Sequence, residues 1–72
     1  MPVLNVDILT KCSTDQKKQL IEKLAKSTYD LLNIPPEKIV VIAKEFEATD
    51  WGRGGVVAND ESFEELSRRK SM

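Results

Sequence analysis

Residues 13–33 read STDQKKQLIEKLAKSTYDLLN, and this stretch contains the signals for both ends of a helix. Ser13 followed by Gln16 fits a capping box, in which each side chain bonds a free backbone amide at the helix start. Between the two ends, apolar residues recur at three- and four-residue spacing while lysine and acidic residues fall mainly on the opposite side. Asn33 suits the C-terminal cap, and Pro35 and Pro36 prevent the helix from continuing. We therefore expect one helix with one buried face.

Apolar runs on both sides of this helix predict two strands. The first, Val3–Leu9, alternates in character and places Leu4, Val6 and Ile8 on one face. The second, Ile39–Ala43, is β-branched almost throughout, which is typical of a central strand covered on both faces. Strands joined by a helical crossover of this length are expected to be parallel neighbours with the helix packed over one face. The predicted fold is an α/β (α+β) protomer with β-α-β order.

A glycine-rich segment, Trp51–Val57, follows the second strand. Its glycines permit the positive φ angles of a tight turn or short C-terminal hairpin. Residues 58–72 form a tail, in which Asp60 is expected to cap a short helix that carries Phe63. The basic run Arg68–Lys70 suits a frayed, solvated end. The whole chain, residues 1–72, is expected to be a single domain.

Length and composition limit how so small a chain is stabilised. A lone domain of 72 residues with one cysteine and no histidine has no internal disulfide, no zinc finger and no histidine-activated nucleophile. Hydrophobic residues make up 40% of the sequence, more than a monomer of this size is expected to bury. We therefore expect a symmetric homo-oligomer.

Charge and hydropathy exclude several classes of partner. The net charge of −1 argues against a nucleic-acid-binding or anionic-membrane surface, because both partners attract an excess of basic residues. No apolar stretch approaches the roughly 20 residues of a membrane span, and the N-terminus lacks the features of a signal peptide. The expected location is the cytoplasm.

Pro2 is the first candidate for chemistry, because it opens the first strand directly after Met1. A proline nitrogen is basic only at the chain terminus, since elsewhere it is a tertiary amide. Removal of Met1 would therefore create a secondary amine at the end of a strand. The alternative is that Pro2 only begins an edge strand, where its missing donor does no harm.

Two other features suggest chemistry less strongly. Cys12 precedes a helix N-terminus and follows Lys11, a setting that stabilises thiolates, but a small half-buried filler is the favoured role because no histidine can serve as its base. The glycine loop lacks the spacing and context of a dinucleotide or phosphate loop.

Taken in order, these features resemble the 4-oxalocrotonate tautomerase family. The resemblance rests on Met1-Pro2 before a strand, Ser13-x-x-Gln16-Lys17 at the helix start, Pro35 after the helix, a Val-Ile strand that ends near Glu45, and Trp51-Gly52-x-Gly54-Gly55. It implies a protomer that pairs into dimers, usually three dimers forming a hexamer. It also implies that the amine of Pro2 is the catalytic base, shuttling a proton between carbon and oxygen of an enol beside a carbonyl.

The sequence departs from the family where the substrate would bind. The family's founding members hold the substrate carboxylate with two arginines, and those positions read Cys12 and Val40 here. Three cations are candidates to replace them. Arg53 is the first choice, because a guanidinium grips a carboxylate with two parallel donors and Arg53 lies beside Trp51. The alternatives are Lys38, expected on a strand face with Val40, and Lys11.

The resulting expectation is a tautomerase for a 2-hydroxy-alkenoate or phenylpyruvate-like monocarboxylate, working without metal or cofactor. An apolar pocket is expected from Leu4, Ile42 and Trp51, since such surroundings pull the pKa of an amine toward neutrality. Two alternatives stay open. One is a hydratase or dehalogenase of unsaturated acids, with Asp7 or Glu45 activating water. The other is a non-catalytic oligomer that binds a small acid or a protein.

Overall fold

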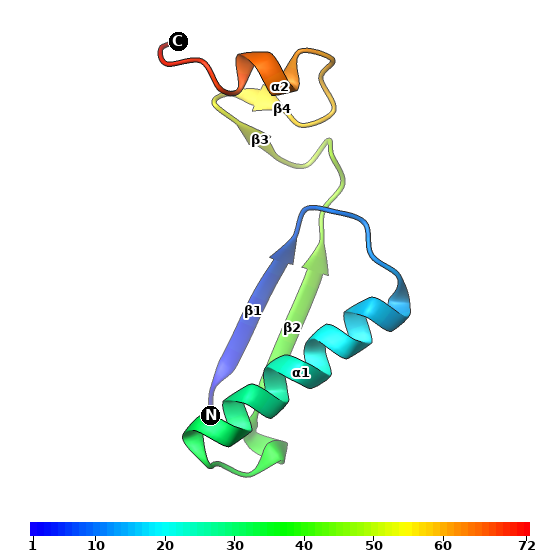
Figure 1. Cartoon of the computed structure of the whole chain (residues 1–72), viewed down its shortest axis with the longest axis vertical. Helices are drawn as coiled ribbons and strands as arrows, with labels where there is room; N and C mark the ends of the chain where they lie inside the picture. The colour runs from blue at the N-terminus through cyan, green and yellow to red at the C-terminus, as the bar shows by residue number, and fades with distance from the viewer.

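A computed structural model describes all residues, 1–72, as two parts joined end to end (Figure 1). One part is a two-stranded sheet with a long helix across it, and the other is a hairpin with a short helix at the far end. The elements in chain order are β1 Val3–Ile8, α1 Thr14–Leu32, the 3-10 turn η1 Pro36–Lys38, β2 Val40–Glu45, β3 Gly52–Arg53, β4 Val56–Val57 and α2 Phe63–Leu66.

The β-α-β unit has the predicted topology. β1 and β2 are parallel neighbours, paired from Val3 with Val40 to Ile8 with Glu45. Along β1 the alternation is as predicted, because Leu4, Val6 and Ile8 are half-buried while the residues between them are exposed. The alternating pattern of the sequence therefore correctly predicts which side chains of β1 are half-buried.

Both ends of α1 are also confirmed. The hydroxyl of Ser13 accepts a hydrogen bond from the Gln16 amide at 3.0 Å, and the Gln16 side chain accepts one from the Ser13 amide at 2.8 Å. At the other end Asn33 adopts the left-handed conformation with φ of 52°, and its amide bonds the carbonyl of Tyr29 at 2.9 Å. The chain therefore leaves α1 where the sequence predicts.

The start of β2 differs from prediction. Lys38 does not share a strand face with Val40, because it lies in η1, where its amide bonds the carbonyl of Pro35 at 3.0 Å. The next amide, that of Ile39, bonds the carbonyl of Pro36 at 3.0 Å. Since both amides are used inside the turn, neither can join the sheet ladder. Proline at the start of the turn favours this geometry through its fixed φ.

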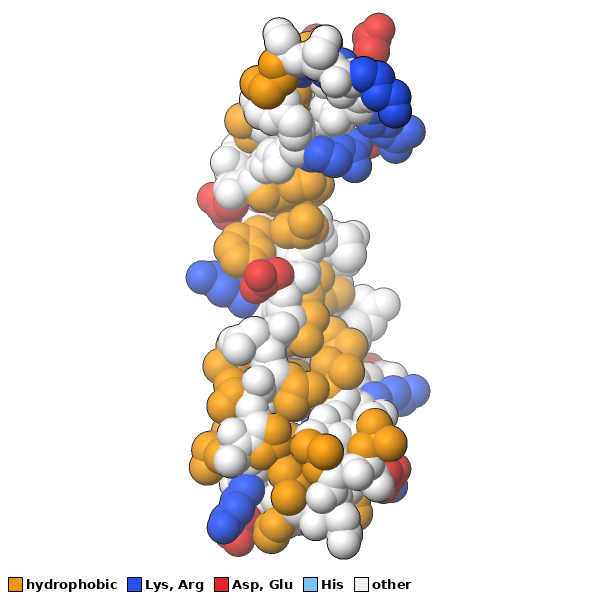
Figure 2. All heavy atoms as spheres, turned by 90° about the vertical axis from the view of Figure 1, so that its left-hand side faces the viewer, with side chains coloured by type: hydrophobic (Ala, Val, Ile, Leu, Met, Phe, Trp, Pro, Cys, Tyr) orange, Lys and Arg blue, Asp and Glu red, His pale blue; other side chains and the backbone are white.

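β2 is not a central strand in the protomer, contrary to prediction. Its sheet has only two strands, and Val40 and Ile42 are 36% and 47% exposed on the face opposite α1. Figure 2 shows apolar side chains spread over this part of the molecule. The sequence of β2 is thus typical of a strand that is buried on both faces, but a single chain covers only one face of β2.

The predicted hairpin is confirmed as β3 and β4, which pair Gly52 with Val57 and Arg53 with Val56. Gly54 and Gly55 form its turn with φ of 62° and 82°, values that side-chain-bearing residues rarely adopt. Gly52 is required for a different reason, because a Cβ there would collide with the carbonyl oxygen of Val56.

The tail is more ordered than predicted. Asp60 does not cap α2; its carboxylate instead accepts from the Ser62 amide at 2.8 Å in a turn before the helix. Arg69 is exposed, as predicted, but its guanidinium is held, because it donates to the carbonyls of Leu66 at 2.8 Å and Gly54 at 3.0 Å. The tail therefore folds back onto the hairpin, and we call β3, β4 and residues 58–72 together the C-terminal unit.

The overall shape is elongated. The radius of gyration is 16.6 Å, whereas a compact chain of this length would have about 11 Å. The two least exposed residues, Val56 at 7% and Ser67 at 8%, both lie in the C-terminal unit, so the β-α-β unit has no fully buried residue. No helix is both long enough and apolar enough to cross a membrane.

Candidate active site

Pro2 is fixed at the start of the sheet. Its carbonyl accepts a hydrogen bond from the Val40 amide at 3.1 Å, which extends the β1–β2 ladder by one residue beyond Val3. Its nitrogen lies outside the ladder, and Met1 before it is 80% exposed. Removal of Met1 would therefore leave a secondary amine whose position is set by the backbone of both strands.

Trp51 and Arg53 meet on Phe63 in the C-terminal unit. The ring of Trp51 packs edge-on against Phe63 with 5.5 Å between centroids, and the Arg53 guanidinium lies 4.9 Å from the centroid of the same ring. Arg53 also donates from Nε and Nη2 to the hydroxyl of Ser67, at 3.2 and 2.9 Å. The indole N–H of Trp51 is buried without a hydrogen-bond partner.

The predicted site residues do not come together within one chain. Pro2 and Lys38 lie at the end of the sheet where both strands begin, since the Pro2 carbonyl bonds Val40 just after η1. Lys11 follows the opposite end of β1, and the unit with Trp51 and Arg53 lies beyond that end (Figure 1). Of the three candidate cations, only Lys38 is at the Pro2 end of its own protomer.

The pocket expected from Leu4, Ile42 and Trp51 is likewise absent from the single chain. Leu4 pairs with Val41 on the half-buried face, whereas Ile42 is one residue further along β2 and faces the exposed side. Alternate strand residues point to opposite faces, so these two side chains cannot line one cavity in the same protomer.

The carboxyl ends of the strands hold a polar cluster that sequence analysis missed. The thiol of Cys12 donates to Oε1 of Glu45 at 3.0 Å, and the Lys17 ammonium lies 3.4 Å from the same oxygen. The hydrogen bond to Glu45 raises the pKa of the Cys12 thiol, and desolvation adds to the effect. The bonds from Cys12 and Lys17 lower the pKa of the Glu45 carboxyl. Cys12 and Glu45 are 33 residues apart, and no local pattern signals such a pairing.

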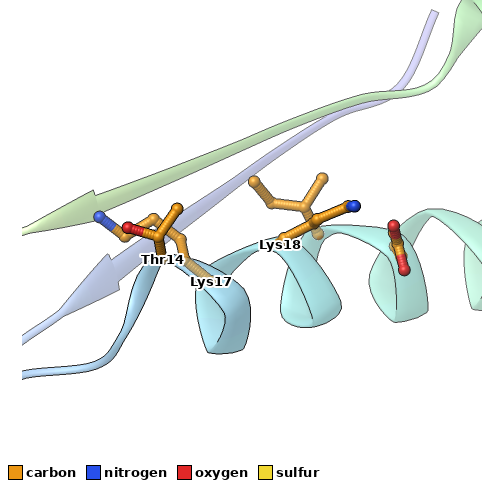
Figure 3. Close-up of a pocket in the computed structure, with 5 residues that line it drawn as sticks. Thr14, Lys17 and Lys18 are labelled. Carbon is orange, nitrogen blue, oxygen red and sulfur yellow. The ribbon is translucent and has the colours of Figure 1, made fainter.

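Two hollows mark the surface, and Pro2 lines neither. One, of about 360 Å³, lies beside this cluster and includes Lys11, Cys12 and Phe46. The other, of about 290 Å³, is a shallow groove on the first turns of α1 between Thr14 and Glu22 (Figure 3). A site around Pro2 is therefore incomplete in one chain.

Comparison with known proteins identifies the protein family to which the chain belongs. Residues 2–61 match the model of a family described as tautomerase enzymes. A protein from Listeria innocua named a probable tautomerase is 38% identical over 60 residues, which cover 83% of this chain and 98% of that protein. The chain belongs to the tautomerase family.

Solved structures give the same result for the fold. The crystal structure of a 4-oxalocrotonate tautomerase homologue superimposes with a TM-score of 0.77 at 33% identity, covering 85% of this chain and 97% of that one. A heterohexamer 4-oxalocrotonate tautomerase from Chloroflexus aurantiacus gives 0.74 at 26% identity, covering 85% and 98%. The resemblance identified from the sequence is thereby confirmed.

Proposed function

We propose that the protein is a keto–enol tautomerase in which the free amine of Pro2 is the general base. The observation that carries this proposal is the position of Pro2, whose carbonyl is bonded to Val40 while its nitrogen stays outside the ladder. The neutral amine takes the hydroxyl proton of an enol and returns a proton to the conjugated carbon, so that enol and ketone interconvert with no net gain or loss. This proton transfer needs no metal or cofactor, and we place it in the cytoplasm.

The proposed substrate is a 2-hydroxy-alkenoate or a phenylpyruvate-like monocarboxylate. Neither Cys12 nor Val40 carries a positive charge, so we expect a cation elsewhere in the chain to hold the carboxylate. Arg53 is our first choice, because a guanidinium can present two parallel donors to a carboxylate. Trp51 would supply apolar surface beside it, since the two residues share the ring of Phe63.

This assignment requires more than one protomer. Pro2 and Arg53 lie in opposite parts of the chain (Figure 1), so a second copy has to bring its C-terminal unit to the first copy's Pro2. We propose a homo-oligomer, most simply a hexamer of three dimers. Its formation would also cover the exposed residues Val3, Val40 and Ile42.

The alternative functions gain less support. A hydratase would need a carboxylate beside the amine, but Glu45 pairs with Ile8 at the opposite end of the sheet from Pro2. At about 3.3 Å per residue that separation is on the order of 20 Å. Asp7 lies one residue nearer and faces the exposed side. A non-catalytic binding protein is favoured only by the residues at positions 12 and 40.

The amine is tested first by intact mass, which should show that Met1 is absent. Pro2→Ala, or an uncleaved extension before Pro2, should then lower turnover of phenylenolpyruvate by roughly 10²–10⁴-fold, the usual contribution of a general base. Circular dichroism serves as the control for folding. Unchanged turnover in a verified extended protein would exclude this mechanism.

The cation is tested by substituting the candidates singly. Arg53→Ala should lower kcat/KM by roughly tenfold to a hundredfold, since a charge-assisted hydrogen bond contributes about 1.5–3 kcal/mol. Lys38→Ala and Lys11→Ala are the matched controls and should change kcat/KM less than threefold (about 0.6 kcal/mol). A larger loss in either lysine variant, with Arg53→Ala unaffected, would move the carboxylate site to that lysine.

A further inference from the structure

The C-terminal tail contains the contacts that hold Arg53. The family match ends at residue 61, so α2 and everything after it lie outside the matched region. Within this segment Ser67 is only 8% exposed, although serine is usually a surface residue. Its hydroxyl accepts two donors from Arg53, at 3.2 and 2.9 Å. The tail therefore contributes one of the least exposed polar contacts in the chain.

These contacts leave one edge of the guanidinium free. Ser67 occupies Nε and one hydrogen of Nη2, and the ring of Phe63 covers one face of the group at 4.9 Å. The hydrogens of Nη1 and the second hydrogen of Nη2 have no protein acceptor. Nη1 and Nη2 together form the end-on edge through which arginine binds a carboxylate with two parallel bonds.

The tail is itself fastened to the hairpin turn. Arg69 donates to the carbonyl of Gly54 at 3.0 Å, and a Cβ added at Gly54 would lie 3.0 Å from the carbonyl oxygen of Ser67. The backbone of Ser67 therefore passes close to the turn that follows Arg53. Glu64 in α2 and Arg68 just after the helix also form an exposed ion pair at 2.8 Å. Ser67 is thus held by backbone packing, which lets it orient Arg53.

We propose that Ser67 and Phe63 are positioning residues that orient the Arg53 guanidinium toward the substrate carboxylate. The C-terminal tail is then part of the substrate-binding site. This inference rests on the proposed role of Arg53. Fixing the side chain before binding lowers the conformational entropy lost when the carboxylate binds, because the arginine is already ordered. The effect should appear in substrate affinity and not in the proton transfer at Pro2.

The test is a double-mutant cycle with phenylenolpyruvate as substrate. Ser67→Ala should raise KM about two- to tenfold, the cost of ordering one long side chain on binding, with kcat changed less than twofold. In an Arg53→Ala background the same substitution should raise KM no further. Ser67→Thr, which keeps the hydroxyl, should restore most of the affinity. Ser71→Ala is the matched control, since Ser71 makes no side-chain hydrogen bond.

A second readout does not depend on turnover. The Nε–H of Arg53 should give a protected signal in nitrogen-15 NMR spectra of the intact protein, and Ser67→Ala should remove that protection while Ser71→Ala keeps it. Phe63→Leu provides an independent variant if Ser67→Ala folds poorly, and it should also raise KM with little change in kcat.

The outcomes separate the two proposals. If Arg53→Ala raises KM but Ser67→Ala and Phe63→Leu do not, the proposal that Ser67 and Phe63 position Arg53 is wrong. The proposed role of Arg53 then still stands. An equal KM increase from Ser67→Ala in both backgrounds would also overturn the positioning role of Ser67. A decrease in KM would overturn it too, because it would mean that the tail competes with the substrate for Arg53. If Arg53→Ala leaves KM unchanged, both proposals fail, whereas the role of Pro2 is judged separately by Pro2→Ala.

Discussion

Cys12 lies in a polar cluster with Glu45 and Lys17 at the carboxyl ends of the strands. Its thiol donates to Glu45, so the thiol form is stabilised and the pKa of Cys12 is raised, while Lys17 acts in the opposite direction. Glu45→Gln removes the negative charge and should lower the thiol pKa toward its ordinary value. At a fixed mildly alkaline pH more thiolate is then present, and alkylation by iodoacetamide should accelerate severalfold.

Lys17→Met provides the opposite control for this prediction. Removing the ammonium should raise the pKa of Cys12 further and slow alkylation, because Lys17 lowers the thiol pKa. The rates are measured across the pH range in which the thiol titrates. Equal profiles for the natural protein and Glu45→Gln would show that Glu45 does not control the thiol.

Val40 is the second position at which the sequence resemblance implies an arginine, and its surroundings make it the more promising one to substitute. Its amide bonds Pro2, and its side chain is on the exposed face. Val40→Arg should therefore place a cation near the proposed catalytic amine of Pro2. It should raise kcat/KM for 2-hydroxymuconate, a dicarboxylate, by roughly tenfold to a hundredfold. Phenylenolpyruvate should gain less. Val40→Leu is the size control, and an equal gain for both substrates would contradict the prediction.

The residues that carry the family resemblance were identified from the sequence, but their partners were not. Pro2 and Trp51 are recognisable because local motifs surround them. Arg53 bonds Ser67, 14 positions away, and Arg69 bonds Gly54, 15 positions away. Both contacts form only when the tail packs on the hairpin, and no periodic pattern in the sequence predicts that packing. Lys38 was misplaced for a local reason, since Pro36 starts a turn that keeps it out of the strand.

At the scale of elements, α1 was predicted almost to the residue because its capping chemistry is local. Ser13→Ala removes one bond of the capping box and should destabilise the protein by about 0.5–2 kcal/mol. Ser27→Ala is the matched control, because Ser27 is exposed in the middle of α1 and its side chain makes no hydrogen bond. Urea unfolding followed by circular dichroism measures both. Ser27→Ala should be neutral or slightly stabilising, because alanine favours the helix more than serine does. A loss equal in the two variants would show that the cap is not its cause.

The burial of β2 on both faces, which its sequence predicts, is not reached in a single chain. Its β-branched run correctly indicates burial on both faces, but the sequence does not state which molecule provides the second cover. In the protomer Ile42 is 47% exposed. The sequence pattern therefore describes the assembled state that we propose.

The whole molecule is elongated and has little core, which is unfavourable for an isolated chain. Its radius of gyration exceeds that of a compact domain, and no residue of the β-α-β unit is fully buried. Chains this short rarely supply more than about 3–5 kcal/mol of stability without a staple. Association of copies through the apolar face of the sheet would supply the missing burial, at about 25 cal/mol per Å² of apolar surface.

Ile42→Asp tests this assembly and its link to activity. A carboxylate in the middle of the exposed sheet face would have to be desolvated on association, so the oligomer should dissociate to smaller species. Sedimentation equilibrium at micromolar concentration should show a hexamer, or at least a dimer, for the natural protein and a lower mass for Ile42→Asp. Turnover should fall along with the mass, because Pro2 and Arg53 then have no second chain to bring them together.

Ser27→Asp is the control for this prediction. It adds the same charge on the exposed side of α1 and should preserve both mass and turnover. A folded, fully active monomer of either protein would show that one chain suffices, and the site shared between protomers would be wrong.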